Sequence, residues 1–229
     1  EREAAMRHTT TRGKILYLRE GEETGREWFT ITKHKNGGRT FRAMCEMDDH
    51  DVLRDVTYSV DENWLPLDCF VRLTIHDRFV GSTWFRFDEA GGECEGFTAA
   101  EGRIRQRIER TARPRSFGAH PIICDMWHLS QFDKSGPKRQ SWNILMSSPA
   151  PDGGTGPMLS SHDLTAEYYG EEEITVPAGT FNADHFAFML GDPHPANEEL
   201  WCVGDDIIPV KIAYPIYQAT YELAELEVG

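Results

Sequence analysis

The segment Ser116–His128 concentrates side chains that can move protons. Its sequence, SFGAHPIICDMWH, places His120, Cys124, Asp125 and His128 within nine residues. An imidazole, a carboxyl group and a thiol are the side chains most often used for acid–base and nucleophilic chemistry. The segment therefore indicates a site, although it matches no named catalytic motif.

A short helix is predicted to carry these groups. Pro121 favours the first turn of a helix, where its missing N–H leaves no hydrogen bond unmade. If the helix continues to about Gln131, His120, Cys124 and His128 follow one another at i, i+4 and i+8.

Within this helix, Asp125 and His128 are i, i+3 neighbours and are predicted to form a hydrogen bond. Asp125 would then orient His128 and raise its basicity, which makes His128 the candidate base. The candidate acid is His120 or Glu95, whose pKa would be raised by burial beside Cys94. The alternative is a surface helix whose Asp125 and His128 meet only water.

The same residues permit a second interpretation as a metal site. Thiolate and imidazole bind Zn or Fe, so His120, Cys124 and His128 are alternative ligands. This site would need a further ligand from a strand, for which the candidates are His76, His162 and His185. For Cys124 the favoured interpretation is a core residue, because two isoleucines precede it.

Other chemistries lack their sequence motifs. The chain contains no G-x-S-x-G, no phosphate-binding loop and no dinucleotide fingerprint. We therefore expect neither nucleotide-dependent chemistry nor a serine hydrolase, and we expect no cofactor unless the metal alternative holds.

Alternation along two predicted strands suggests residues that bind a substrate. In strand 69–76, Phe70 and His76 share a face, and in strand 80–87 Trp84 and Arg86 lie on the corresponding face. Aromatic rings mixed with cationic groups can line a barrel cavity, or they can cover an outer surface. The predicted substrate-binding residues are Arg86, Trp84, His76, Trp127 and Tyr221.

These residues must be positioned by a sheet. Short β-type runs recur every 8 to 15 residues, and HKNGG at 34–38 is a strong hairpin signal. Only the segment at about 121–131 interrupts the pattern. We predict an all-β fold, a single antiparallel lipocalin-like barrel or half-barrel with one docked helix; the pattern does not say whether the helix lies inside or outside.

Composition sets limits on partners and location. The 229 residues suit one domain, predicted over 14–229 after a loose segment 1–13. The net charge of −14 disfavours nucleic acid and anionic membranes, and no run of 18 apolar residues occurs. Five scattered cysteines suit a reducing compartment, so a cytoplasmic location is expected. Because the sequence begins with Glu1, processing of the N-terminus stays open.

The region 163–226 resembles a family of uncharacterised bacterial proteins with a lipocalin-like, strongly curved sheet. The segments that carry the resemblance are Gly170–Phe181 (GEEEITVPAGTF), Leu200–Asp206, Pro209–Ile212 (PVKI) and Tyr221–Leu223. The resemblance implies a fold and no activity, and it does not include residues 120–128.

Two functions follow from these observations. The first is a cofactor-independent isomerase or lyase, including dehydratases, that transfers a proton on a small, largely apolar cyclic or aromatic compound. In this enzyme Arg86 or a tyrosine would stabilise the developing negative charge. The alternative is a carrier that binds a hydrophobic small molecule without turnover. A homodimer is left open in both cases.

Overall fold

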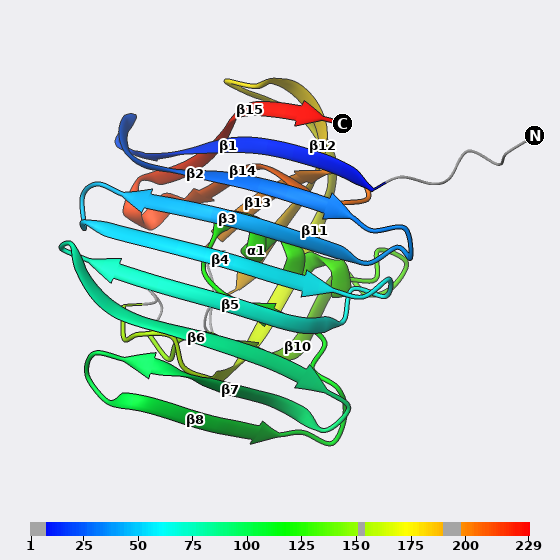
Figure 1. The fold of residues 1–229 in the computed structure, drawn as a ribbon. Helices are drawn as coiled ribbons and strands as arrows, with labels where there is room; N and C mark the ends of the chain where they lie inside the picture. Colours follow the sequence, from blue (N-terminus) through cyan, green and yellow to red (C-terminus); the bar gives the residue numbers. More distant parts are fainter. Residues whose placement is uncertain (1–7, 151–153, 190–197) are drawn as a thin grey trace, which may run out of the picture.

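One fifteen-stranded sheet forms most of the chain in the computed structural model, which describes residues 8–150, 154–189 and 198–229 (Figure 1). The strand order is β8-β7-β6-β5-β4-β3-β2-β1-β15-β14-β13-β12-β11-β10-β9. Neighbouring strands are antiparallel except β9 and β10, which are parallel. The order divides the sheet into two meanders, which meet where β1 pairs with β15.

The N-terminal meander contains eight strands that follow one another in the chain and in the sheet. They are β1 (Thr9–Arg19), β2 (Glu22–Lys33), β3 (Arg39–Met47), β4 (Val52–Val60), β5 (Pro66–Ile75), β6 (Arg78–Asp88), β7 (Gly91–Thr98) and β8 (Gly102–Glu109). The predicted hairpin at 34–38 is confirmed, because β2 pairs with β3 across it.

The C-terminal meander follows the helical segment. Its strands are β10 (Arg139–Met146), β11 (Ser160–Val176), β12 (Gly179–Met189), β13 (Glu198–Val203), β14 (Ile208–Tyr214) and β15 (Ala219–Val228). Between the meanders lie the two-residue β9 (Phe117–Gly118), the helix α1 (Ile122–Trp127) and a 3₁₀ turn (His128–Gln131), and a second 3₁₀ turn (Pro215–Tyr217) precedes β15.

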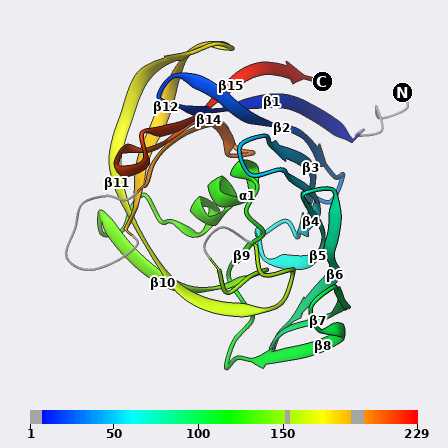
Figure 2. The same cartoon turned by 90° about the vertical axis from the view of Figure 1, so that its left-hand side faces the viewer.

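The sheet curves around α1, which lies on its concave side (Figure 2). The two edge strands, β8 and β9, do not pair with each other, so the sheet is an open, curved one. The predicted all-β fold with one docked helix is thus confirmed in its half-barrel form, and the helix is inside. No helix in the described part of the chain has the length and apolar character to span a membrane.

Side chains on the concave side form an aromatic core around α1. Phe41, Tyr58, Phe117 and Trp127 are buried, and the ring centroids of Phe41 and Trp127 lie 4.9 Å apart. This inner face comes from alternate residues of each strand, because successive side chains of a strand point to opposite sides.

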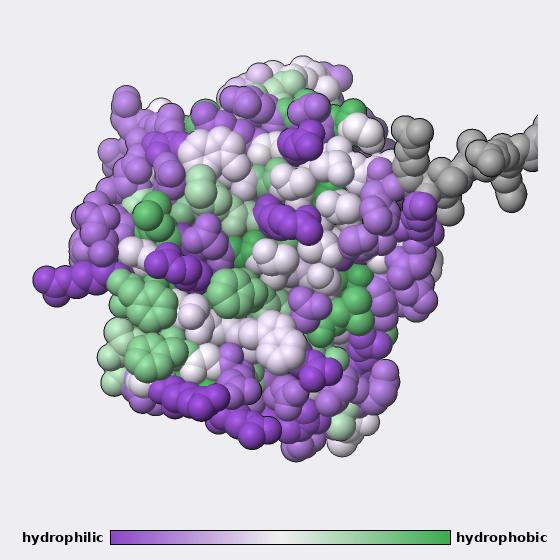
Figure 3. Space-filling model, in the orientation of Figure 1, coloured by the Kyte–Doolittle hydropathy of each residue, from purple (hydrophilic) through white to green (hydrophobic). Residues whose placement is uncertain are grey.

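The convex side carries the residues that were predicted as one possible cavity lining. Phe70 and Trp84 are each 42% exposed there, where apolar side chains lie among charged ones (Figure 3). Of the two interpretations of this face, the outer surface is the correct one.

The sheet begins earlier in the chain than predicted. The predicted loose segment 1–13 includes Thr9–Gly13, which belong to β1 and pair with both β2 and β15. β-branched threonines at 9–11 suit a strand, and residues 1–7 lie outside the described residues. Gly170 marks an irregularity within the single long strand β11, where this glycine adopts a φ of +111°.

The position of α1 depends on a carboxylate from β2. Glu27 is fully buried; its Oε2 accepts a hydrogen bond from Ile122 N at 2.7 Å and its Oε1 from Ile123 N at 3.1 Å. The hydroxyl of Tyr17 donates to Oε2 at 2.8 Å. The first turn of a helix has N–H groups without partners, and Pro121 at the N-cap makes no side-chain hydrogen bond. Glu27 therefore caps α1 across 95 residues of chain.

Replacing this carboxylate should destabilise the whole fold. In Glu27→Ala, buried donors of α1 and Tyr17 lose their acceptor, which we expect to lower the free energy of unfolding by about 4 kcal/mol. Urea denaturation followed by circular dichroism measures the change. The exposed Glu22→Ala on the same strand is the control, and equal stability of the two variants would contradict the capping role.

Candidate functional site

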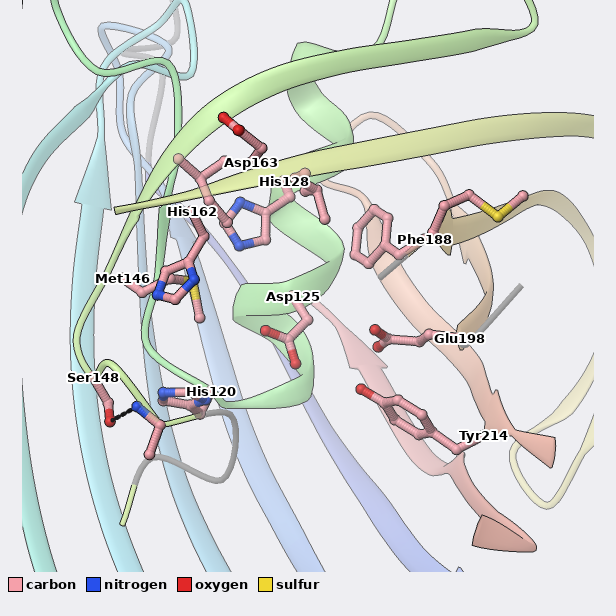
Figure 4. A pocket seen from close by; sticks show the side chains of 14 residues that line it. His120, Asp125, His128, Met146, Ser148, His162, Asp163, Phe188, Glu198 and Tyr214 are labelled. Carbon is pink, nitrogen blue, oxygen red and sulfur yellow. Dashed lines mark hydrogen bonds between the residues drawn. The ribbon is translucent and has the colours of Figure 1, made fainter. Parts of the chain in front are cut away.

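A cavity of about 360 Å³ lies between α1 and the C-terminal meander. Its walls combine apolar side chains with groups that can ionise or donate hydrogen bonds (Figure 4). The apolar residues include Ile144, Met146, Leu164 and Phe188. The polar residues of the lining include His120, Asp125, His128, His162, Glu198 and Tyr214.

His128 begins the 3₁₀ turn that follows α1, and it is 3% exposed. Its Nδ1 lies 2.8 Å from the hydroxyl of Ser116, which also accepts a hydrogen bond from Trp142 Nε1 at 3.4 Å. Burial lowers the pKa of His128 to about 4, so the imidazole is neutral at pH 7.

The predicted hydrogen bond between Asp125 and His128 is wrong, because Ser116 orients His128 instead. Asp125 lines the same cavity, where the charge of Glu198 acts on its carboxyl group. The α-helix changes to a 3₁₀ turn at His128, which alters the i, i+3 geometry that the prediction assumed.

His120 precedes α1 and lies beside the same cavity. Its φ of +75° is rare for a residue with a side chain, and such strain concentrates at functional sites. Its Nε2 is buried and makes no hydrogen bond to a described atom. Burial lowers the pKa of His120 to about 3, assisted by the charges of Arg54 and the neighbouring histidines. This second imidazole is also neutral at pH 7.

Asp125, Glu198 and Tyr214 form an acidic side of the cavity. Burial raises the pKa of Glu198 to about 7, which a hydrogen bond with Tyr214 partly opposes. The pKa of Asp125 is raised well above its usual value, first by burial and then by the negative charge of Glu198. Burial and these two carboxyl groups also raise the pKa of Tyr214.

Three predicted site residues lie away from the cavity, on the outer surface. Glu95 is exposed on β7 and pairs with Arg103 at 3.0 Å, so its predicted burial is wrong. The guanidinium of Arg86 lies 5.2 Å from the ring centroid of the exposed Trp84.

His76 also lies outside the cavity. It is exposed in the turn after β5 and pairs with Asp51 at 2.9 Å. The exposed side chains of Glu95, Trp84 and Arg86 lie on the convex face of the sheet, which alternation alone did not distinguish from the concave face.

Trp127 and Tyr221 differ in their distance from the site. Trp127 is 2% exposed and belongs to the core, where its Nε1 donates to the carbonyl oxygen of Asp206 at 3.2 Å. Trp127 is not among the described residues that line the cavity. Tyr221 packs against Tyr214 of the acidic side, and their ring centroids lie 5.9 Å apart. Burial and the charge of Glu198 raise its pKa to about 12.

The alternative metal site is not assembled. The thiol of Cys124 is buried, accepts a hydrogen bond from Ala119 N at 3.3 Å and donates one to Phe117 O at 3.5 Å. Burial raises the pKa of this thiol well above its usual value, which disfavours the thiolate that a metal needs. Within the described ranges, no three His, Cys, Asp or Glu side chains are grouped to hold a metal ion.

Glu198 is the site residue that the sequence analysis missed. It shares the inward face of β13 with Leu200 and Cys202, both of which are buried. The signal that could have identified Glu198 is a charged residue at a position that, by alternation, shares a face with buried apolar residues. The same signal could have identified Glu27, which shares a face of β2 with Phe29.

The arrangement is that of a curved β-sheet that encloses a small polar-and-apolar cavity. No protein-family model matches the chain, and no curated protein sequence matches it. Among solved structures, it is similar to a beta-barrel-like protein of the domain of unknown function DUF1849 from Brucella abortus. That likeness has a TM-score of 0.57 and 12% identity, and it covers 98% of this chain and 100% of the other.

A DUF1089 family protein from Pseudomonas aeruginosa is more distant, with a TM-score of 0.46 and 7% identity over 83% of this chain and 90% of the other. The similarity to the DUF1849 protein shows a beta-barrel-like fold and leaves the chemistry of the cavity to its residues.

The buried carboxyl group of Glu198 should make stability fall as pH rises. Between pH 4.5 and 7 the unfolded chain releases this proton while the folded chain, with a pKa of about 7, retains it. Relative to Glu198→Gln, the wild type should lose about 3 kcal/mol of unfolding free energy between pH 4.5 and pH 8.

Urea denaturation across this pH range measures the difference. Glu199→Gln is the charge-matched control, because Glu199 is the next residue of β13 and is more exposed. Parallel stability curves for the wild type and Glu198→Gln would contradict the buried ionisation.

Proposed function

We propose that this protein is a proton-transfer enzyme of the isomerase or lyase type, acting on a small, largely apolar cyclic or aromatic compound bound in the cavity. One observation carries the proposal: two neutral imidazoles and two carboxyl groups of raised pKa line the same cavity. Perturbed pKa values grouped in a cavity are a common property of acid–base sites.

Glu198 is the group best suited to exchange a proton with the substrate. Its pKa of about 7 lies near the operating pH, where general acid–base catalysis is most efficient. The hydroxyl of Tyr214 holds the Glu198 carboxyl group, and the charge of Glu198 in turn raises the pKa of the neighbouring Asp125.

His128 and His120 suit a different role from the one expected from the sequence. With pKa values of about 4 and about 3, they are weak bases at pH 7. A neutral imidazole N–H can instead donate a hydrogen bond to an oxygen that becomes negative as the proton leaves carbon. In this role Ser116 fixes the imidazole ring, because its hydroxyl oxygen lies 2.8 Å from Nδ1 of His128.

The apolar wall supports the alternative of a carrier. Ile144, Leu164 and Phe188 offer a surface that could retain an apolar ligand without any reaction. Binding alone therefore does not distinguish the two functions, whereas proton exchange does.

The test first identifies a ligand and then measures whether the protein exchanges the carbon-bound hydrogens of that ligand with solvent. Native and denatured mass spectrometry of the purified protein first identify any retained organic compound, and a set of small cyclic ketones and phenols supplies further ligands. Each binder is then incubated in D₂O with the protein and followed by NMR. An enzyme incorporates solvent deuterium at carbon; binding without incorporation by any ligand would support the carrier instead.

His128→Ala should separate catalysis from binding. Loss of its hydrogen bond to the transition state should lower the exchange rate by about 100-fold or more, while ligand affinity changes only a few fold. His76→Ala, whose exposed ring pairs with Asp51 away from the cavity, is the control. A His128→Ala protein that exchanges at the wild-type rate would remove His128 from the mechanism.

A further inference from the structure

A buried carboxyl oxygen in the cavity has no hydrogen-bond partner among the described residues. Glu198 is 4% exposed, and its Oε1 makes no hydrogen bond to a described atom. Tyr214 contacts the same carboxyl group and accounts for only part of its hydrogen-bonding capacity. Buried polar atoms are seldom left unpaired, so this oxygen indicates a donor that arrives with the ligand.

The charges around this oxygen favour a donor that is positive. Asp125 of α1 and Tyr214 of β14 line the cavity together with Glu198 (Figure 4), and the ring centroid of Tyr221 of β15 lies 5.9 Å from that of Tyr214. The buried Arg54 of β4 stabilises the charge of Asp125, and the carboxylate of Glu27 acts on Asp125 in the opposite sense. No cation contributes to the pKa of Glu198 among the described residues.

Two facing carboxyl groups repel each other when both are ionised, and a cation between them removes this repulsion. An anionic ligand would add to it. The net charge of −14 also attracts cations to the protein and repels anions.

The remaining walls suit the hydrocarbon part of such a ligand. Phe188 presents an aromatic ring to the cavity, and Leu164 and Ile144 add aliphatic surface. Aromatic faces attract ammonium groups as well as apolar ones. A volume of about 360 Å³ is within the range of small-molecule sites.

We infer that the ligand of this cavity is a small apolar amine, whose protonated nitrogen binds between Asp125 and Glu198 and whose hydrocarbon body packs against Phe188. This inference rests on the proposed function in one respect, that the same cavity holds the substrate. With the nitrogen fixed at the acidic side, the opposite end of the ligand faces His120 and His128.

Three probes of similar shape test the charge: 2-phenylethylamine, 2-phenylethanol and 3-phenylpropanoate. Isothermal titration calorimetry with the full chain at pH 8 should show the amine binding at least about tenfold more tightly than the alcohol, and the carboxylate not binding. At pH 5.5 the amine keeps its proton, as lysine does, while Glu198 with its pKa of about 7 becomes neutral. The preference for the amine should then fall to within about twofold.

Glu198→Gln should remove the preference at pH 8, and Glu199→Gln, which alters the same net charge on the same strand, should retain it. If the alcohol binds as tightly as the amine at pH 8, the inference is wrong. It is also wrong if the preference persists at pH 5.5 in a folded protein. Binding and deuterium incorporation are separate measurements. Selective binding of the amine without deuterium incorporation would therefore refute the proposed enzymatic function and support the inferred amine ligand.

Discussion

The carboxylate of Glu27 ties the helix to the sheet, and the cavity depends on that connection. A six-residue helix is too short to be stable alone, and α1 has no side-chain cap of its own. The buried Glu27 supplies acceptors for its first N–H groups and fixes where it begins. This placement in turn directs Asp125 and His128 toward the C-terminal meander rather than into solvent.

The site then arises from the meeting of three parts of the chain. The helical segment contributes two neutral histidines and Asp125, while β13 and β14 contribute Glu198 and Tyr214. Burial is the common cause of their shifted pKa values, since it disfavours every charged form at once. The same enclosure that stabilises the fold therefore makes the carboxyl groups easier to protonate and the imidazoles harder to protonate.

Sequence patterns predicted the strands, the hairpin at 34–38 and the helix near 121–131, because periodicity and turn residues are local signals. They also placed His120, Asp125 and His128 at one site. They failed for Trp84 and Arg86, because alternation separates two faces without saying which one is concave. The pairing of Ser116 with His128 could not be predicted, since it depends on the packing of β9 against β10 and of the helix inside the sheet.

The pairing of β1 with β15 makes the first and last described strands immediate neighbours. Strands that adjoin in the sheet but are separated by almost the whole sequence give a topology of high contact order, which slows folding. During synthesis, the edge of β1 that pairs with β15 stays uncovered until β15 has been made. Until β15 has been synthesised, the N-terminal meander exposes the unpaired edge of β1, and this edge is open to misassociation with other chains.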